Sequence, residues 1–150
     1  MTNTTDRRRF LQVMATGTAA TACAALGVSC GASGPSGPIA AGNVSSVANP
    51  SLTAISGEEV ALGRDDGGLY AMTLVCTHAS CDMETQGSVS VSGVTCSCHG
   101  SRFDANGDVL VGPANAPLEH FEVTVDASGA ITINADSVVD ASTRTQVTTG

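Results

Sequence analysis

The segments Cys76–Cys81 (CTHASC) and Cys96–Ser101 (CSCHGS) hold four of the six cysteines and two of the three histidines in this chain of 150 residues. We call them the first box and the second box. Cysteines that only pack in a core scatter along a chain, and surface histidines seldom pair with cysteines at such short spacing. Thiolates and imidazoles are ligands of zinc, copper and iron. The boxes therefore predict a metal site where two loops meet.

The ligand types alone leave zinc open, because two cysteines and two histidines can form a structural tetrahedral zinc site. The spacing argues against zinc, since each box pairs a cysteine with a histidine, whereas common zinc fingers place two cysteines in one box and two histidines in the other. Each box also carries a surplus cysteine, Cys81 and Cys98, which a zinc site with four ligands leaves unexplained. In an oxidising compartment these two could cross-link the loops. A structural zinc module stays as an alternative.

The sequence around the boxes is typical of short strands. The whole chain contains three Phe, one Tyr and no Trp, and Val, Thr, Ser, Ala and Gly dominate. Turn residues such as Asn49-Pro50 and Ser92-Gly93 separate short runs that carry Val and Leu. We expect antiparallel strands at 43–47, 52–55, 60–63, 69–75, 89–91, 94–95, 109–111, 118–125 and 131–133. The pattern predicts one all-β domain.

The ligand pattern Cys-x-His, 17 intervening residues, Cys-x-x-His resembles that of the Rieske [2Fe-2S] family. The resemblance covers most of residues 60–125 and continues through Gly100, Ser101, Phe103-Asp104, Gly112-Pro113-Ala114 and Pro117-Leu118. It implies a Rieske-like antiparallel β-sandwich or barrel with a loop subdomain that binds the cluster. It also implies one-electron transfer by one [2Fe-2S] cluster in each chain.

Carried over residue by residue, the resemblance implies that Cys76 and Cys96 bind one iron. His78 and His99 bind the other, and neutral imidazoles in place of thiolates make such a cluster easier to reduce. Cys81 and Cys98 are then the disulfide that joins the loops. The resemblance further implies that Ser101 donates a hydrogen bond to a cluster sulfide, and that Gly112 and Pro113 lie on a third loop that shields the cluster.

Four positions depart from the quinol-oxidising members of that family. Phe103 stands where they have a tyrosine whose hydroxyl bonds a ligand sulfur, and loss of this donor lowers the potential. Ala79 replaces a usual Leu, Ser80 a usual Gly, and Ser97 a usual Pro. The first hypothesis is a subunit of a respiratory quinol-cytochrome c type oxidoreductase. The alternative is the small Rieske subunit of a periplasmic oxidase such as arsenite oxidase, which resembles this chain in having phenylalanine here.

His120 is the one histidine that follows the boxes. A catalytic oxygenase domain needs two histidines and a carboxylate for a separate iron, so this chemistry is excluded. His120 lies in an alternating run beside Glu119, and we expect it to be a strand residue that faces solvent.

The first thirty residues read as an export leader. Paired arginines precede Phe10-Leu11, and no charge occurs from Phe10 to Val28, as in a twin-arginine signal. The leader is either cleaved, kept as a membrane anchor, or processed at Cys30 as in a lipoprotein; alternatively Cys30 is an ordinary residue of an apolar leader. We therefore expect the protein at the periplasmic, extracytoplasmic face of a bacterial membrane.

The remaining chain divides into a Gly/Pro/Ser linker at 31–40, the predicted Rieske domain at 41–135 and a polar, loose tail at 136–150. After Cys30, three arginines face 13 carboxylates, which leaves a charge of -10. Such a field repels nucleic acid and favours a basic protein partner or a positively charged docking surface. The expected partners are redox proteins, either cytochromes of b or c type or a molybdenum oxidase subunit.

Overall fold

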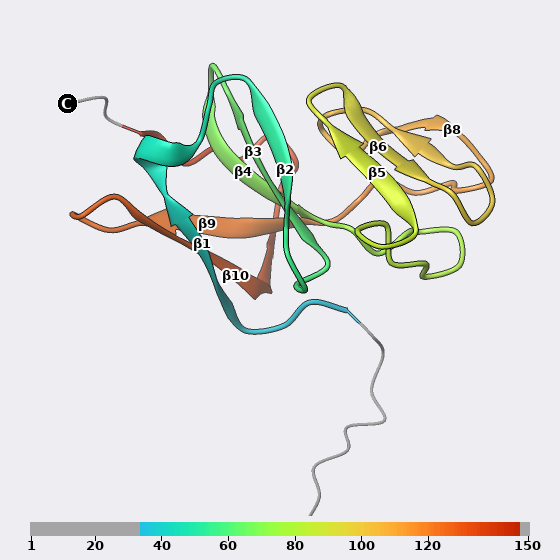
Figure 1. Cartoon of the computed structure of the whole chain (residues 1–150), viewed down its shortest axis with the longest axis horizontal. Helices are drawn as coiled ribbons and strands as arrows, with labels where there is room; N and C mark the ends of the chain where they lie inside the picture. The colour runs from blue at the N-terminus through green and yellow to red at the C-terminus, as the bar shows by residue number, and fades with distance from the viewer. Residues whose placement is uncertain (1–33, 148–150) are drawn as a thin grey trace, which may run out of the picture. The chain divides into compact units, whose positions relative to one another are not determined.

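The computed structural model describes residues 34–147 (Figure 1). These residues form ten strands and one 3-10 turn, η1 (Val44–Ser46). None of the helical structure described there is long and apolar enough to cross a membrane. The expected all-β fold is confirmed. The strands are β1 (Pro38–Asn43), β2 (Ser51–Ile55), β3 (Val60–Asp65), β4 (Gly68–Thr73), β5 (Gly87–Ser90), β6 (Gly93–Cys96), β7 (Arg102–Phe103), β8 (Val109–Val111), β9 (His120–Val125) and β10 (Ala130–Val139).

Two antiparallel sheets make up the domain. The larger has six strands in the order β1-β10-β9-β4-β3-β2, and the smaller has four in the order β5-β6-β7-β8. The chain leaves the larger sheet after β4, forms the smaller sheet, and returns to the larger sheet as β9, which pairs with β4. Figure 1 shows the smaller sheet beside the larger one. The cysteine boxes lie on either side of the β5-β6 hairpin, so this excursion carries the candidate site.

Strand β4 supplies side chains to both cores, because successive strand residues point to opposite faces. Leu69 and Ala71 pack in a core of the larger sheet with residues such as Ile133. Tyr70, Met72 and Leu74 pack in a second core, which also contains Val94 and Phe103 of the smaller sheet. All six residues of β4 are buried. This second core also includes Cys76 and Cys96, so the candidate site is attached directly to buried apolar packing.

The structure corrects the expected limits of the domain. Strand β1 begins at Pro38, inside the segment 31–40 that was expected to be a linker, because Pro38 pairs with Asn134. Residues 44–46 form a 3-10 turn rather than the middle of a strand. The segment from 136 is not a loose tail, since β10 continues to Val139 and Thr145 pairs with Leu69. Leader residues 1–30, including Cys30, lie outside the described residues.

His120 is buried, with 2% of its surface exposed, so its expected orientation toward solvent was wrong. Its ring stacks on Tyr70, with ring centres 5.9 Å apart, and its Nε2 lies 2.9 Å from the carbonyl oxygen of Asn106. The residue lies on β9 where that strand returns from the smaller sheet, so its ring packs toward the turn that precedes β8. It takes no part in the candidate metal site.

Candidate metal centre

Both boxes fold into loops with the same backbone closure. In the first box the Cys76 N–H donates to the Cys81 carbonyl at 2.9 Å, and the Cys76 carbonyl accepts from the Ser80 N–H at 2.8 Å. In the second box the Cys96 N–H donates to the Ser101 carbonyl at 2.8 Å, and the Cys96 carbonyl accepts from the Gly100 N–H at 3.0 Å. Each first cysteine is thereby fixed at both of its backbone polar groups.

The fourth residue after each first cysteine has a left-handed backbone. Gly100 has φ of 83° and Ser80 has φ of 55°. Glycine adopts this conformation without steric cost, whereas a residue with a Cβ pays roughly 1–2 kcal/mol. Serine in place of the usual glycine at position 80 therefore raises the conformational free energy of the first loop but leaves its shape intact.

The four candidate ligands divide by exposure. Cys76 and Cys96 are free thiols with 2% and 1% of their surfaces exposed. His78 and His99 are exposed, and their ring centres lie 4.8 Å apart at an interplanar angle of 79°. The loops therefore bring two thiols together on the protein side and two imidazoles together on the solvent side.

The environment of Cys96 is suited to a metal ligand. Burial, and then the neighbouring Cys76 thiol, raise the pKa of the Cys96 thiol, while hydrogen bonds from the Cys98 and His99 amides oppose that rise. A metal ion bound here would replace the thiol proton, and the same amides would then donate to the thiolate. Both cysteines pack in the same buried cluster, and the Cys76 thiol is near enough to raise the pKa of the Cys96 thiol.

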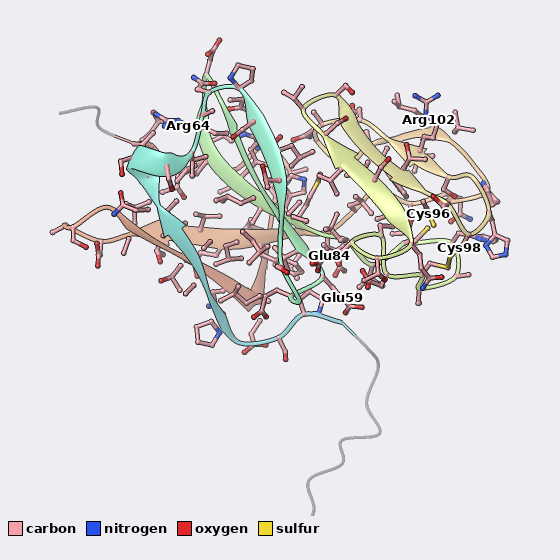
Figure 2. All side chains as sticks on the ribbon, viewed as in Figure 1. Glu59, Arg64, Glu84, Cys96, Cys98 and Arg102 are labelled. Carbon is pink, nitrogen blue, oxygen red and sulfur yellow. A yellow bond between two sulfur atoms is a disulfide. The ribbon has the colours of Figure 1, made fainter. Side chains whose placement is uncertain are left out.

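The disulfide joins the remaining cysteines of the boxes, Cys81 and Cys98, with their Cα atoms 6.7 Å apart. The sulfur atoms of Cys81, Cys96 and Cys98 lie within 4.8 Å of one another. A disulfide sulfur is not a thiolate, however, so within this group only Cys96 offers a metal ligand. Figure 2 shows Cys96 and Cys98 close together at the end of the smaller sheet.

A third loop, which follows β8, closes over the boxes. The Ala114 N–H donates to the Ser101 hydroxyl oxygen at 3.0 Å, and Ser101 is completely buried. The hydroxyl hydrogen has no acceptor among the described residues, so it is available to an atom in the site. Gly112 and Pro113, at the start of this loop, are exposed. Phe103 is 1% exposed and contributes an apolar ring without a donor.

Two residues that support the site, Thr77 and Gln86, were not predicted from the sequence. The Thr77 hydroxyl donates to the Ala116 carbonyl at 2.7 Å, which ties the first box to the third loop. The Gln86 carbonyl accepts from the Ser97 N–H at 2.8 Å, and the Gln86 side-chain amide lies 3.3 Å from the Cys98 sulfur. Thr77 could have been noticed as the polar residue between two ligands. No sequence signal marks Gln86, which precedes the hairpin and is not part of either box.

These features fit a cluster of two irons bridged by two sulfides, and comparison with known proteins identifies the family. Residues 38–122, more than half of the chain, match the Rieske [2Fe-2S] domain family. The chain is 39% identical over 84 residues to the cytochrome b6-f complex iron-sulfur subunit 2 of Nostoc sp., covering 49% of this chain and 42% of that protein. It is 41% identical over 61 residues to the cytochrome b6-f complex iron-sulfur subunit of Synechococcus elongatus, covering 39% and 33%.

The chain thus spans less than half the length of these curated relatives. Among solved structures, it superimposes with a TM-score of 0.50 on a chain from the complex of reduced oxygenase and oxidized ferredoxin in carbazole 1,9a-dioxygenase. That match has 21% sequence identity and covers 69% of this chain and 97% of the other, which supports the fold. The chain therefore belongs to the Rieske [2Fe-2S] domain family, and it is an electron-transfer protein whose cofactor is a [2Fe-2S] cluster.

Proposed function

We propose that Cys76 and Cys96 hold one iron of the cluster and that His78 and His99 hold the other. The observation that carries this assignment is that the loops place two free thiols in one buried cluster and two exposed imidazoles beside each other, with ring centres 4.8 Å apart. When bound, the cluster supplies a one-electron couple. The alternative of a structural zinc module has no support from the family match.

The residues around the site have different roles. The buried cysteines exclude water from the inner side, and the amides of Cys98 and His99 donate to the Cys96 sulfur, which stabilises negative charge there. The Ser101 hydroxyl is held by the Ala114 amide and retains its own hydrogen for donation. The exposed histidines are the side chains that a partner reaches first.

We further propose that the protein is an exported, membrane-associated subunit of a quinol-cytochrome c type oxidoreductase. Support comes from its likeness to iron-sulfur subunits of cytochrome b6-f complexes and from the paired arginines of the leader. Export by the twin-arginine route would place it at the periplasmic face of the membrane, held there by an anchor or by a lipid on Cys30. Its partners would then be cytochromes of b or c type.

The small Rieske subunit of a periplasmic oxidase such as arsenite oxidase is the second candidate. The buried Phe103, which lacks the hydroxyl expected of quinol-oxidising members, favours it. The two candidates differ in their neighbours on the chromosome. An adjacent cytochrome b gene supports the first, and an adjacent gene for a large molybdenum subunit supports the second.

Ligand substitution in the full-length protein tests the cluster assignment. We expect Cys76→Ser, Cys96→Ser, His78→Ala and His99→Ala each to abolish the visible absorption and the electron spin resonance signal of the reduced protein. His120→Gln is the matched control, because His120 lies outside the site, and it retains both signals. A wild-type protein that carries zinc and no iron would refute the assignment. Mass spectrometry of the native amino terminus tests cleavage and lipidation at Cys30.

A further inference from the structure

Arg102 lies on the outward face of the smaller sheet. It pairs across strands with Thr95 on β6 and with Val111 on β8, and side chains at paired positions point to the same face. Ser88 on β5 pairs with Thr95 and extends the row. Figure 2 shows Arg102 at the outer side of the smaller sheet, with Cys96 and Cys98 at one end of that sheet. The register shifts by one residue between β7 and β8, which leaves Leu110 as an extra, exposed residue between the paired Val109 and Val111. We call Thr95, Arg102, Val111 and this bulged Leu110 the Arg102 face.

Apolar side chains are exposed beside this arginine. Leu110 is 59% exposed and Val111 is 47% exposed, and they are two of the four large apolar side chains that stand out as exposed among the described residues. Single exposed apolar residues are common, but two adjacent ones beside an arginine resemble the composition of protein interfaces. Arginine is also enriched among the residues that contribute most to binding energy.

Each strand of the Arg102 face runs directly into a loop of the metal centre. Thr95 precedes the ligand Cys96, Arg102 follows the buried Ser101, and Val111 precedes Gly112 of the third loop. Arg102 is three residues from His99, so their Cα atoms are at most about 11 Å apart. A protein seated on this face would therefore lie next to the cluster.

Arg102 is also the available cation of this region. It is the only lysine or arginine between residues 76 and 118, where Asp82, Glu84, Asp104 and Asp108 supply negative charge. Within residues 34–147 it has neither an ion pair nor a side-chain hydrogen bond. Arg64, in contrast, donates to the Val47 carbonyl at 2.9 Å, and Arg144 binds Asp65 at 2.8 Å.

We propose that the Arg102 face is a docking surface for a redox protein that presents a carboxylate surrounded by apolar side chains. The guanidinium binds the carboxylate, and Leu110 and Val111 exclude water around that pair. This inference rests on the proposed electron-transfer function and adds the chemistry of the partner. Carboxylates of the chain that lie farther than roughly 8 Å from the docked partner are screened by salt at physiological concentration, whereas Arg102 acts at contact.

Electron exchange between the full-length holoprotein and two purified c-type cytochromes of similar potential tests this inference. In one cytochrome carboxylates surround the exposed haem edge, and in the other lysines surround it. Second-order rate constants are measured by stopped flow at physiological ionic strength for the wild type, Arg102→Gln, Leu110→Ser and Arg64→Gln. Arg64→Gln is the matched control, because it removes the same charge from the larger sheet. Midpoint potentials of all variants are used to correct the rates for driving force.

We expect Arg102→Gln to slow exchange with the acidic cytochrome by about fivefold and Arg64→Gln by less than twofold. We expect Leu110→Ser to slow it also, although this change leaves charge unaltered. Equal effects of the two arginine substitutions would show that only net charge matters and would overturn the proposal. Arg102-dependent self-association in sedimentation would overturn it as well, because the occupant would then be a second copy. A wild-type protein without the visible absorption and the electron spin resonance signal of the cluster would instead refute the proposed ligand assignment.

Discussion

The guanidinium carbon of Arg144 lies 4.2 Å from the centre of the Tyr70 ring. The ring of His120 also stacks on Tyr70, at an interplanar angle of 21°. Arg144 also donates at 2.8 Å to the Asn106 side-chain oxygen and to the Asp65 carboxylate. The last part of the described chain is thereby joined to β4 and to the turn before β8.

We expect Arg144→Leu to lower the free energy of unfolding by about 2 kcal/mol, through loss of the cation–π contact and of partly buried charged hydrogen bonds. The ion pair with Asp65 adds little, since that carboxylate is 41% exposed. Urea unfolding followed by circular dichroism measures the change. Arg64→Leu is the control, and an equal loss in both variants would contradict a special role for the segment around Arg144.

His120 predicts a pH dependence of stability. Burial, foremost, and the positive charge of Arg144 hold the pKa of His120 below its usual 6.5, although the Asn106 carbonyl, Asp108 and Asp140 act in the opposite direction. Between the two pKa values, His120 therefore binds a proton in the unfolded chain but not in the folded protein. Stability is complete above pH 6.5 and declines as the pH falls from there toward the folded-state pKa.

The measurement is urea unfolding of the wild type and of His120→Gln between pH 7.5 and about 5. Carboxylates also titrate in the lower part of this range, but they do so in both proteins. The difference between the two curves of stability against pH therefore isolates the contribution of His120. We expect the substitution to flatten the decline, while glutamine retains a donor for the Asn106 carbonyl. Parallel curves would contradict the prediction.

Phe103→Tyr adds a hydroxyl at the position where quinol-oxidising relatives have one. A hydrogen bond from it to a ligand sulfur stabilises the more negative, reduced state, and a net contribution of about 1 kcal/mol corresponds to a rise of about 40 mV in a one-electron midpoint potential. Redox titration measures it. Phe121→Tyr, in the other core, is the matched control and leaves the potential unchanged. An unaltered potential in Phe103→Tyr would refute the missing-donor explanation.

The disulfide between Cys81 and Cys98 closes a loop with a sequence separation of 17. Cross-links of this length stabilise a domain by about 3 kcal/mol through restriction of the unfolded chain. We expect the double substitution Cys81→Ala/Cys98→Ala to lower the thermal midpoint and to speed bleaching of the visible absorption on heating. Wild-type protein treated with a reductant that opens the disulfide gives the same result if the bond itself is responsible. Unchanged bleaching in both samples would show that the loops hold without it.

The sequence predicted the all-β fold because its strands alternate locally and are separated by turn residues, as in Leu52–Ile55 and Ile131–Ile133. It also located both boxes, whose chemistry depends on residue types at short spacing. The partners of β1 and of the segment around Thr145 could not be predicted, because Pro38 pairs with Asn134 and Thr145 pairs with Leu69, far along the chain.

The expectation that His120 faces solvent was wrong for a related reason. Alternation in β9 shows that neighbouring residues point to opposite sides, but the side that faces solvent depends on what covers it. The turn between β7 and β8 packs against this end of β9, and its Asn106 carbonyl lies beside the imidazole of His120. A polar residue is buried because a specific acceptor lies beside it, and that acceptor comes from another part of the chain.

The matching backbone closures of the two boxes explain how the chain departs from its family without losing the ligand geometry. Bonds from Cys76 and Cys96 to residues four and five positions later fix the number of residues in each loop, whatever side chains they carry. Ala79 and Ser97 are consequently open to substitution, and evolution can adjust the surface seen by a partner at these two sites. Insertions and deletions are a different matter, since one residue more or fewer would turn a histidine away from its counterpart.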